Sequence, residues 1–149
     1  MAAQSTLLSR QQLIDAAQAP LKAFNRKDWD AVLASITADF EYDEVATHRR
    51  VAGVDQLMPL WQGWAEAFPD AEASFDRSLP GENTVVLEVT WRGTHKGPLP
   101  TPSGPIPATG KRIDVRACVV TELAGEKAKL QRHYFDMATM LQQLGVAGS

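Results

Sequence analysis

Cysteine, basic charge and long apolar runs are all scarce in this chain of 149 residues. With Cys118 as the single cysteine, neither an intrachain disulfide nor a cysteine-only zinc site can form. The net charge of −3 provides no basic stripe for a nucleic acid. No apolar run approaches the roughly 20 residues that span a bilayer, and the first residues lack the basic start and apolar core of a signal peptide. We therefore expect a cytoplasmic protein without a nucleic-acid or membrane partner.

Motifs for common cofactors and metals are absent as well. The chain has no GxSxG nucleophile motif, no phosphate-binding Walker loop and no GxGxxG that opens a helix. Its three histidines, His48, His95 and His133, lie in separate segments without the spacing of a zinc site. The sequence therefore predicts no metal site.

The order of the predicted elements indicates one α+β domain over residues 1–149, a length typical of a single domain. Helices gathered before strands favour an antiparallel sheet over a parallel βαβ fold. Apolar periodicity predicts helices at about residues 9–24, 28–36, 54–68 and 137–144, and strands at about residues 40–45, 71–79, 84–96, 111–123 and 127–136.

Local signals add detail to this outline. Ser9, with Gln12 three positions later, predicts a capping box at the start of the first helix. Pro20 lies inside the apolar pattern of that helix and should kink the helix or end its regular hydrogen bonding. The segment at residues 46–53, ATHRRVAG, is predicted to be a loop. Residues 97–110 hold five prolines and three glycines, which indicates a lid or a long hairpin connection.

Three stretches in the last third of the chain carry a resemblance to a known family: GTHKGPL at residues 93–99, IPATGK at 106–111 and YFDMATMLQQLG at 134–145. With the element order, they resemble the SnoaL-like polyketide cyclases of the nuclear transport factor 2-like superfamily over roughly residues 10–145. The resemblance implies a cone-shaped α+β fold, in which a curved antiparallel sheet and three N-terminal helices surround an apolar pocket. It also implies a cofactor-independent enzyme on a small apolar carbonyl compound, with proton abstraction that leads to aldol cyclisation or isomerisation.

The strand predicted from Lys111 leaves the assignment of its faces open. Polar and apolar side chains alternate along it, so the two sets point to opposite faces of the sheet. The pattern alone allows the apolar set to face the core. The resemblance instead implies that Arg116 and Cys118 face the pocket, and that an outer face of Val115, Ala117 and Val119 forms a homodimer.

The resemblance also implies that His133 faces inward with Gln131 and Phe135, and it places His133 where the family has the aspartate that abstracts the proton. A neutral imidazole can act as a base near pH 7, because its unperturbed pKa is about 6.5. Arg116 would then stabilise the enolate with its fixed charge. The expected substrate-binding residues are Tyr42, Trp61, Trp64, His95, Cys118 and Phe135.

Several of these residues have two interpretations. Trp61 and Trp64 share one helix face, so they belong to the core, the pocket wall or both. His95 is either a hydrogen-bond donor at the rim of the pocket or a residue that shapes the following turn. Tyr42 could donate to a substrate oxygen, and Glu44 or its neighbour Asp43 could supply a carboxylate at the mouth of the cone.

Two other functions remain open at this point. The first is hydration of an epoxide, as in the related limonene epoxide hydrolases, with Asp114 and Arg116 as part of an Asp–Arg–Asp set. The second is a module that binds a small apolar molecule without catalysis.

Overall fold

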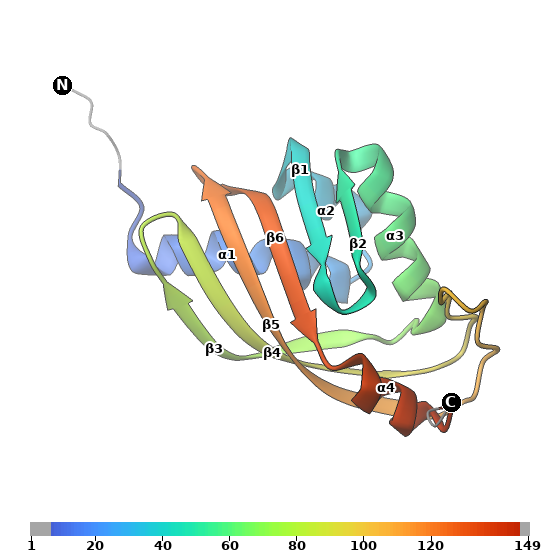
Figure 1. Ribbon diagram of the computed structural model, residues 1–149. Helices are drawn as coiled ribbons and strands as arrows, with labels where there is room; N and C mark the ends of the chain where they lie inside the picture. The colour runs from blue at the N-terminus through green and yellow to red at the C-terminus, as the bar shows by residue number, and fades with distance from the viewer. Residues whose placement is uncertain (1–6, 147–149) are drawn as a thin grey trace.

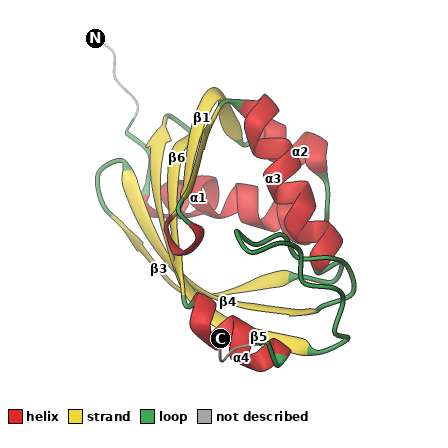
Figure 2. Ribbon diagram, turned by 45° about the vertical axis from the view of Figure 1, so that its right-hand side comes forward, coloured by secondary structure: helices red, strands yellow, loops and turns green. Residues whose placement is uncertain are grey.

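The computed structural model describes residues 7–146, so the two ends of the predicted domain, residues 1–6 and 147–149, lie outside it. One six-stranded sheet has the order β2-β1-β6-β5-β4-β3. Helices α1, α2 and α3 lie on one side of this curved sheet, and α4 follows β6 at the C-terminal end (Figure 1; Figure 2). The elements are α1 (Arg10–Asn25), α2 (Trp29–Ala34), β1 (Ile36–Glu44), a 3-10 turn (Val45–Thr47), β2 (Arg49–Ala52), α3 (Val54–Ala67), β3 (Glu72–Pro80), β4 (Thr84–Thr94), β5 (Arg112–Ala124), β6 (Lys127–Phe135) and α4 (Met137–Leu144).

The α+β prediction is confirmed, with a curved sheet that partly encloses the helices. The pairings of β3, β4, β5 and β6 in succession are antiparallel, as expected. The pairing of β1 with β2 is also antiparallel. The pairing of β1 with β6 is parallel. It joins the first strand of the chain to the last one and brings Glu44 opposite His133.

The first helix confirms one local prediction and continues past Pro20. Ser9 and Gln12 form the expected capping box, with the Ser9 hydroxyl 3.1 Å from the Gln12 amide nitrogen. Pro20 does not end the helix, which continues to Asn25. Apolar side chains on both sides of Pro20, including Leu21, are buried against the sheet, and this packing outweighs the loss of one helical hydrogen bond.

The segment predicted as a loop at residues 46–53 contains a short strand. β2 pairs antiparallel with β1 after a tight turn at His48, where φ is +60°. This four-residue strand includes Arg49 and Arg50, so it shows none of the apolar alternation by which strands are found in a sequence.

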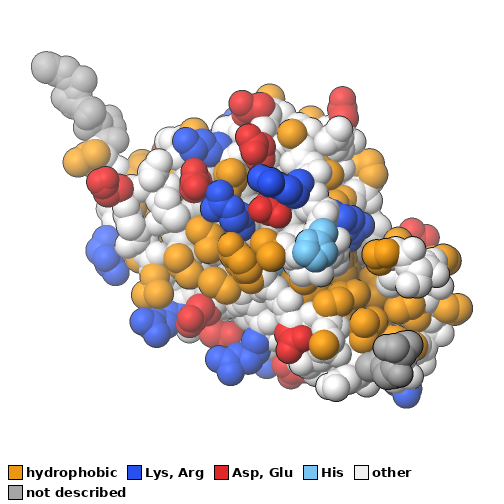
Figure 3. Space-filling view, viewed as in Figure 1, with side chains coloured by type: hydrophobic (Ala, Val, Ile, Leu, Met, Phe, Trp, Pro, Cys, Tyr) orange, Lys and Arg blue, Asp and Glu red, His pale blue; other side chains and the backbone are white. Residues whose placement is uncertain are grey.

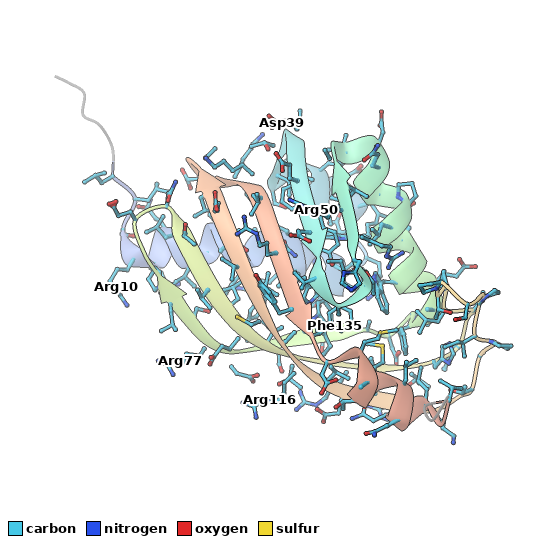
Figure 4. The ribbon with its side chains drawn as sticks, viewed as in Figure 1. Arg10, Asp39, Arg50, Arg77, Arg116 and Phe135 are labelled. Carbon is cyan, nitrogen blue, oxygen red and sulfur yellow. The ribbon has the colours of Figure 1, made fainter. Side chains whose placement is uncertain are left out.

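Strand β5 corrects the assignment of faces that the resemblance implied. Val115, Ala117 and Val119 are all buried against the helices, while Arg116 is exposed and Cys118 half-buried on the opposite, outer face. The apolar dimer surface expected from Val115, Ala117 and Val119 is therefore wrong, because these side chains belong to the core of the domain. Arg116 extends away from the outer face of the sheet (Figure 4).

The Pro/Gly-rich segment at residues 97–110 connects β4 to β5 as a long hairpin. Its two arms pair at Leu99 and Ile106, and the Leu99 side chain is buried. Gly97 passes so close to the end of α3 that a Cβ there would collide with the Glu66 carbonyl oxygen, so no larger residue fits. The connection is thereby anchored to α3.

None of the helices formed by residues 7–146 combines the length and apolar character needed to cross a membrane.

Candidate functional site

An apolar cavity lies between the inner face of the sheet and helices α1 and α3. Its volume is about 60 Å³, enough for a few water molecules, since each needs roughly 10–15 Å³ of such space. A larger ligand must move side chains at its wall. No lysine or arginine contributes to the lining, which consists of Leu21, Phe24, Tyr42, Glu44, Trp61, Trp64, Phe68, Ala71, Trp91, Ile113, Val115, Gln131, His133, Phe135 and Met140.

A buried carboxylate, Glu44, organises the polar side of this cavity. One of its oxygens accepts hydrogen bonds from the Tyr42 hydroxyl and the Trp64 indole, each at 2.8 Å. The other accepts from the Thr47 hydroxyl at 2.6 Å and from the Arg49 guanidinium at 2.7 and 3.1 Å. Burial acts to raise the pKa of Glu44, but the hydrogen bond from Thr47 and the charge of Arg49 outweigh it, and the pKa is lowered. Glu44 is therefore a stable anion.

His133 continues the network from Glu44 into the cavity. Its Nε2 lies 3.1 Å from the Trp91 indole nitrogen, and its Nδ1 lies 3.0 Å from the Tyr42 hydroxyl. An indole N–H can only donate, so Nε2 is the unprotonated acceptor and the proton of the neutral ring sits on Nδ1. Nδ1–H then donates to the Tyr42 oxygen, and the Tyr42 hydroxyl donates to Glu44. Every donor in this hydrogen-bond network therefore has an acceptor.

The pKa values of the buried groups agree with this hydrogen-bond network. Burial lowers the pKa of His133 to about 4, although the charge of Glu44 acts in the opposite direction. The pKa of Tyr42 is raised well above 10 by burial and by the neighbouring Glu44 charge. At neutral pH the set therefore consists of a neutral imidazole with a basic Nε2, a neutral phenol and a carboxylate.

Five of the predicted site residues lie together at the cavity, which they line: Tyr42, Trp61, Trp64, His133 and Phe135. Arg116 and Cys118 do not join them, because they lie on the outer face of β5, in a shallow groove with Glu88 and Tyr134. The predicted pairing of His133 with Arg116 is therefore wrong. Asp114 is also exposed on that face and pairs with Arg92 at 3.2 Å, so the partial Asp–Arg set expected for hydration does not reach the cavity.

His95 is fully buried but does not line the cavity. Its ring packs on Phe68, and Nδ1 lies 3.0 Å from the Thr109 hydroxyl. Its backbone pairs with Gly110 and Lys111 at the base of the long hairpin. This geometry agrees with the interpretation that His95 shapes the turn, and disagrees with that of a donor at the pocket rim.

Sequence reasoning missed two contributors to the site. Trp91 was not assigned to a face, and its indole contacts the proposed base. Arg49, in a segment predicted as a loop, supplies the counter-charge of Glu44. Gln131 was expected to face inward with His133 and Phe135, and it lines the cavity two residues before His133 on the same face of β6.

Within residues 7–146, no group of three or more histidine, cysteine or carboxylate side chains is arranged to hold a metal ion. The donors at the cavity are instead indole, phenol and imidazole groups around a single carboxylate.

Solved structures of the same fold are numerous. A candidate SnoaL-like polyketide cyclase from Jannaschia sp. CCS1 matches with a TM-score of 0.80 and 18% identity, over 100% of each chain. AclR, a candidate hydroxylase from Streptomyces galilaeus, matches with a TM-score of 0.79 and 20% identity, over 95% of this chain and 89% of AclR. An epoxide hydrolase from M. tuberculosis, similar to limonene epoxide hydrolase, has a TM-score of 0.69 and 24% identity, over 90% of each chain.

At these identities the likeness shows the fold. A comparison with curated proteins found no match. The family model of the SnoaL-like polyketide cyclases matches residues 14–144, which is nearly the whole described chain. The chain therefore belongs to the SnoaL-like polyketide cyclase family.

Proposed function

We propose that this protein is a cofactor-independent enzyme that removes a proton next to the carbonyl group of a small, neutral, apolar compound. Nε2 of His133 is the base, and the product forms by aldol cyclisation or isomerisation. One observation carries the proposal. The hydrogen bonds among Glu44, Tyr42, His133 and Trp91 keep the imidazole proton on Nδ1, so the basic lone pair of Nε2 lies at the wall of an apolar cavity, where it accepts from the Trp91 indole N–H.

Trp91 takes the role that Arg116 cannot fill. Its N–H lies next to Nε2, so a carbonyl compound that separates the two groups meets a base and a hydrogen-bond donor together. The C–H proton passes to Nε2, and the electron pair of that bond forms the enolate, whose oxygen accepts from Trp91. Such donors at a developing oxyanion typically contribute 10²–10³-fold to the rate.

The proton then returns to the product, so the reaction needs no co-reactant. In aldol cyclisation the enolate carbon attacks a second carbonyl of the same molecule, and the new alkoxide takes the proton from Nε2. In isomerisation the proton returns to another carbon of the conjugated enolate. Glu44 stabilises the transient imidazolium through Tyr42, because its negative charge favours the protonated ring.

The basicity of His133 fits this chemistry. A pKa of about 4 is close to that of an ordinary aspartate, about 3.9, and to that of the aspartate base of ketosteroid isomerase, about 4.6. Burial thus gives the imidazole the proton affinity of a carboxylate base. A neutral base also suits a cavity that already holds the Glu44 anion.

The test is deuterium incorporation from heavy water, followed by NMR, with β-keto esters, flat aromatic methyl esters and steroid-like enones as substrates. We expect native protein to accelerate exchange at the carbon next to the carbonyl, and His133→Ala to reduce the rate by about 10²–10⁴-fold. His48→Asn is the matched control, since His48 is an exposed turn residue outside the cavity and asparagine tolerates its positive φ.

Exchange that survives His133→Ala would move the base elsewhere. An absence of exchange with native protein across the panel would favour a binding module or epoxide hydration. Hydration lacks its expected residues at the cavity, because Asp114 and Arg116 lie on the outer face.

A further inference from the structure

Gln131 is a buried amide whose hydrogen-bonding capacity is unused within the described protein. Its side chain is inaccessible to solvent and lines the cavity. Neither its amide nitrogen nor its carbonyl oxygen has a partner among residues 7–146. A buried polar group without a partner destabilises a fold, so native proteins rarely keep one without a reason.

Neither strand neighbour of Gln131 forms a hydrogen bond with its amide. Its neighbour on β1 is Tyr42, whose hydroxyl already bonds Glu44 and His133. Its neighbour on β5 is Thr121, which is equally buried and whose hydroxyl is also unpaired in the described chain. Directly opposed residues on paired strands have Cβ atoms about 4.5–5.5 Å apart. Gln131 and Thr121 therefore form a small buried polar region, of which Gln131 lines the cavity.

We propose that Gln131 binds a neutral group of the substrate that offers both a hydrogen-bond acceptor and a donor, such as a primary amide or an enol beside a carbonyl. An amide side chain presents one N–H₂ and one carbonyl, so it pairs with such a group through two hydrogen bonds. An anionic group is disfavoured because no lysine or arginine lines the cavity and the Glu44 carboxylate is nearby. A cationic group is disfavoured because that carboxylate is already paired with Arg49.

The position of Gln131 also indicates how far the polar group of the substrate lies from its reacting carbon. It lies two residues before His133 on the same face of β6, a separation of about 6.6–6.8 Å along the strand. If the reacting carbon sits at His133 as proposed above, the bound polar group lies roughly one aromatic ring further along the cavity. This part of the inference rests on the proposed function, whereas the binding role of Gln131 does not.

The test compares three ligands of similar shape, benzamide, acetophenone and toluene, by quenching of tryptophan fluorescence and by NMR titration. Gln131→Met keeps the volume of the side chain and removes both polar atoms. We expect it to weaken benzamide binding by roughly 10-fold or more, as the loss of two hydrogen bonds implies, and to leave toluene binding unchanged or tighter. Acetophenone, with an acceptor only, should lie between them. Gln62→Met, at an exposed position on α3, is the matched control.

A second measurement reports on the free protein. Replacing an unpaired buried amide by methionine should raise the urea midpoint of unfolding, because the variant no longer buries an unsatisfied group. A lower midpoint would mean that Gln131 has a structural partner, and would overturn the proposal. So would benzamide binding that Gln131→Met weakens no more than toluene binding, or a failure of benzamide to bind native protein at millimolar concentration.

These outcomes are separate from those of the proposed function. Benzamide has no proton on a carbon next to its carbonyl, so its binding does not depend on His133 as a base. A native protein that binds benzamide through Gln131 but exchanges no deuterium would support this inference and contradict the proposed reaction.

Discussion

The two faces of the sheet use the same residue types for different purposes. On the inner face, Glu44 and Arg49 form an ion pair at 2.7 Å whose carboxylate is 1% exposed. On the outer face, Asp114 and Arg92 form a pair at 3.2 Å whose side chains are 62% and 51% exposed. Figure 3 shows the outer side of the sheet, where acidic and basic groups are scattered among apolar patches. Only the inner pair is connected to a titratable group in a cavity, through Tyr42.

The chemical identity of a side chain alone therefore does not locate a functional site. Arg116 has a charge suited to stabilising an enolate, but it lies in solvent on the outer face. Trp91 has only a neutral N–H, but it lies beside the base in an apolar cavity, where a hydrogen bond is stronger than in water.

The largest contrast in stability is expected between the two ion pairs. Arg49→Ala leaves the buried Glu44 carboxylate without its counter-charge, and should reduce the free energy of unfolding by about 3 kcal/mol. Arg92→Ala removes an exposed partner and should cost less than about 1 kcal/mol. Urea unfolding of both variants measures the difference. Equal losses would mean that the buried position of Glu44 has no energetic consequence.

The pH dependence of stability should report on His133. Its pKa is about 4 in the folded protein and about 6.5 in the unfolded chain, so the unfolded chain binds the proton more tightly. Stability is therefore complete above pH 6.5 and falls as the pH drops towards 4, by about 3 kcal/mol at most.

The check is urea unfolding of native protein and His133→Gln at several pH values. Carboxylates contribute in both proteins, so the difference between the two curves isolates the histidine. If the free energies of unfolding of the two proteins changed in parallel between pH 4 and 6.5, folding would not lower the pKa of His133.

Substitutions on the two faces should also differ in their effect on catalysis, as Trp91 and Arg116 illustrate. Trp91→Phe keeps an aromatic ring and removes the N–H donor, and should reduce the exchange rate by about 100-fold, or roughly 2.7 kcal/mol. Arg116→Ala should change it by less than about 2-fold, because this side chain is exposed on the other face. The deuterium-exchange assay measures both, and a larger loss in Arg116→Ala would restore the pairing that the structure contradicts.

The smallest contrast uses two adjacent valines that point in opposite directions. Val119 is fully buried on the inner face, and Val120 is half-buried on the outer face. Val119→Ala should lower the free energy of unfolding by about 2 kcal/mol, and Val120→Ala by less than about 1 kcal/mol. Thermal or urea unfolding distinguishes them. The opposite order would mean that the strand presents its other face to the core.

Much of the fold could be predicted from local signals. The capping box at Ser9 lies where the sequence predicts it, because it depends on residues within a few positions of one another. The short strand β2 could not be predicted, since its existence depends on pairing with β1 rather than on its own composition.

The amino-acid sequence was sufficient to predict the type and order of most elements, the alternation along β5 and the family of the chain. It was not sufficient to predict which face of the sheet encloses the cavity. Alternation distinguishes two faces, but the packing of the helices selects the one that is buried. The contact between Tyr42 and His133, 91 positions apart, likewise depends on the parallel register of β1 and β6, and no local pattern encodes that register.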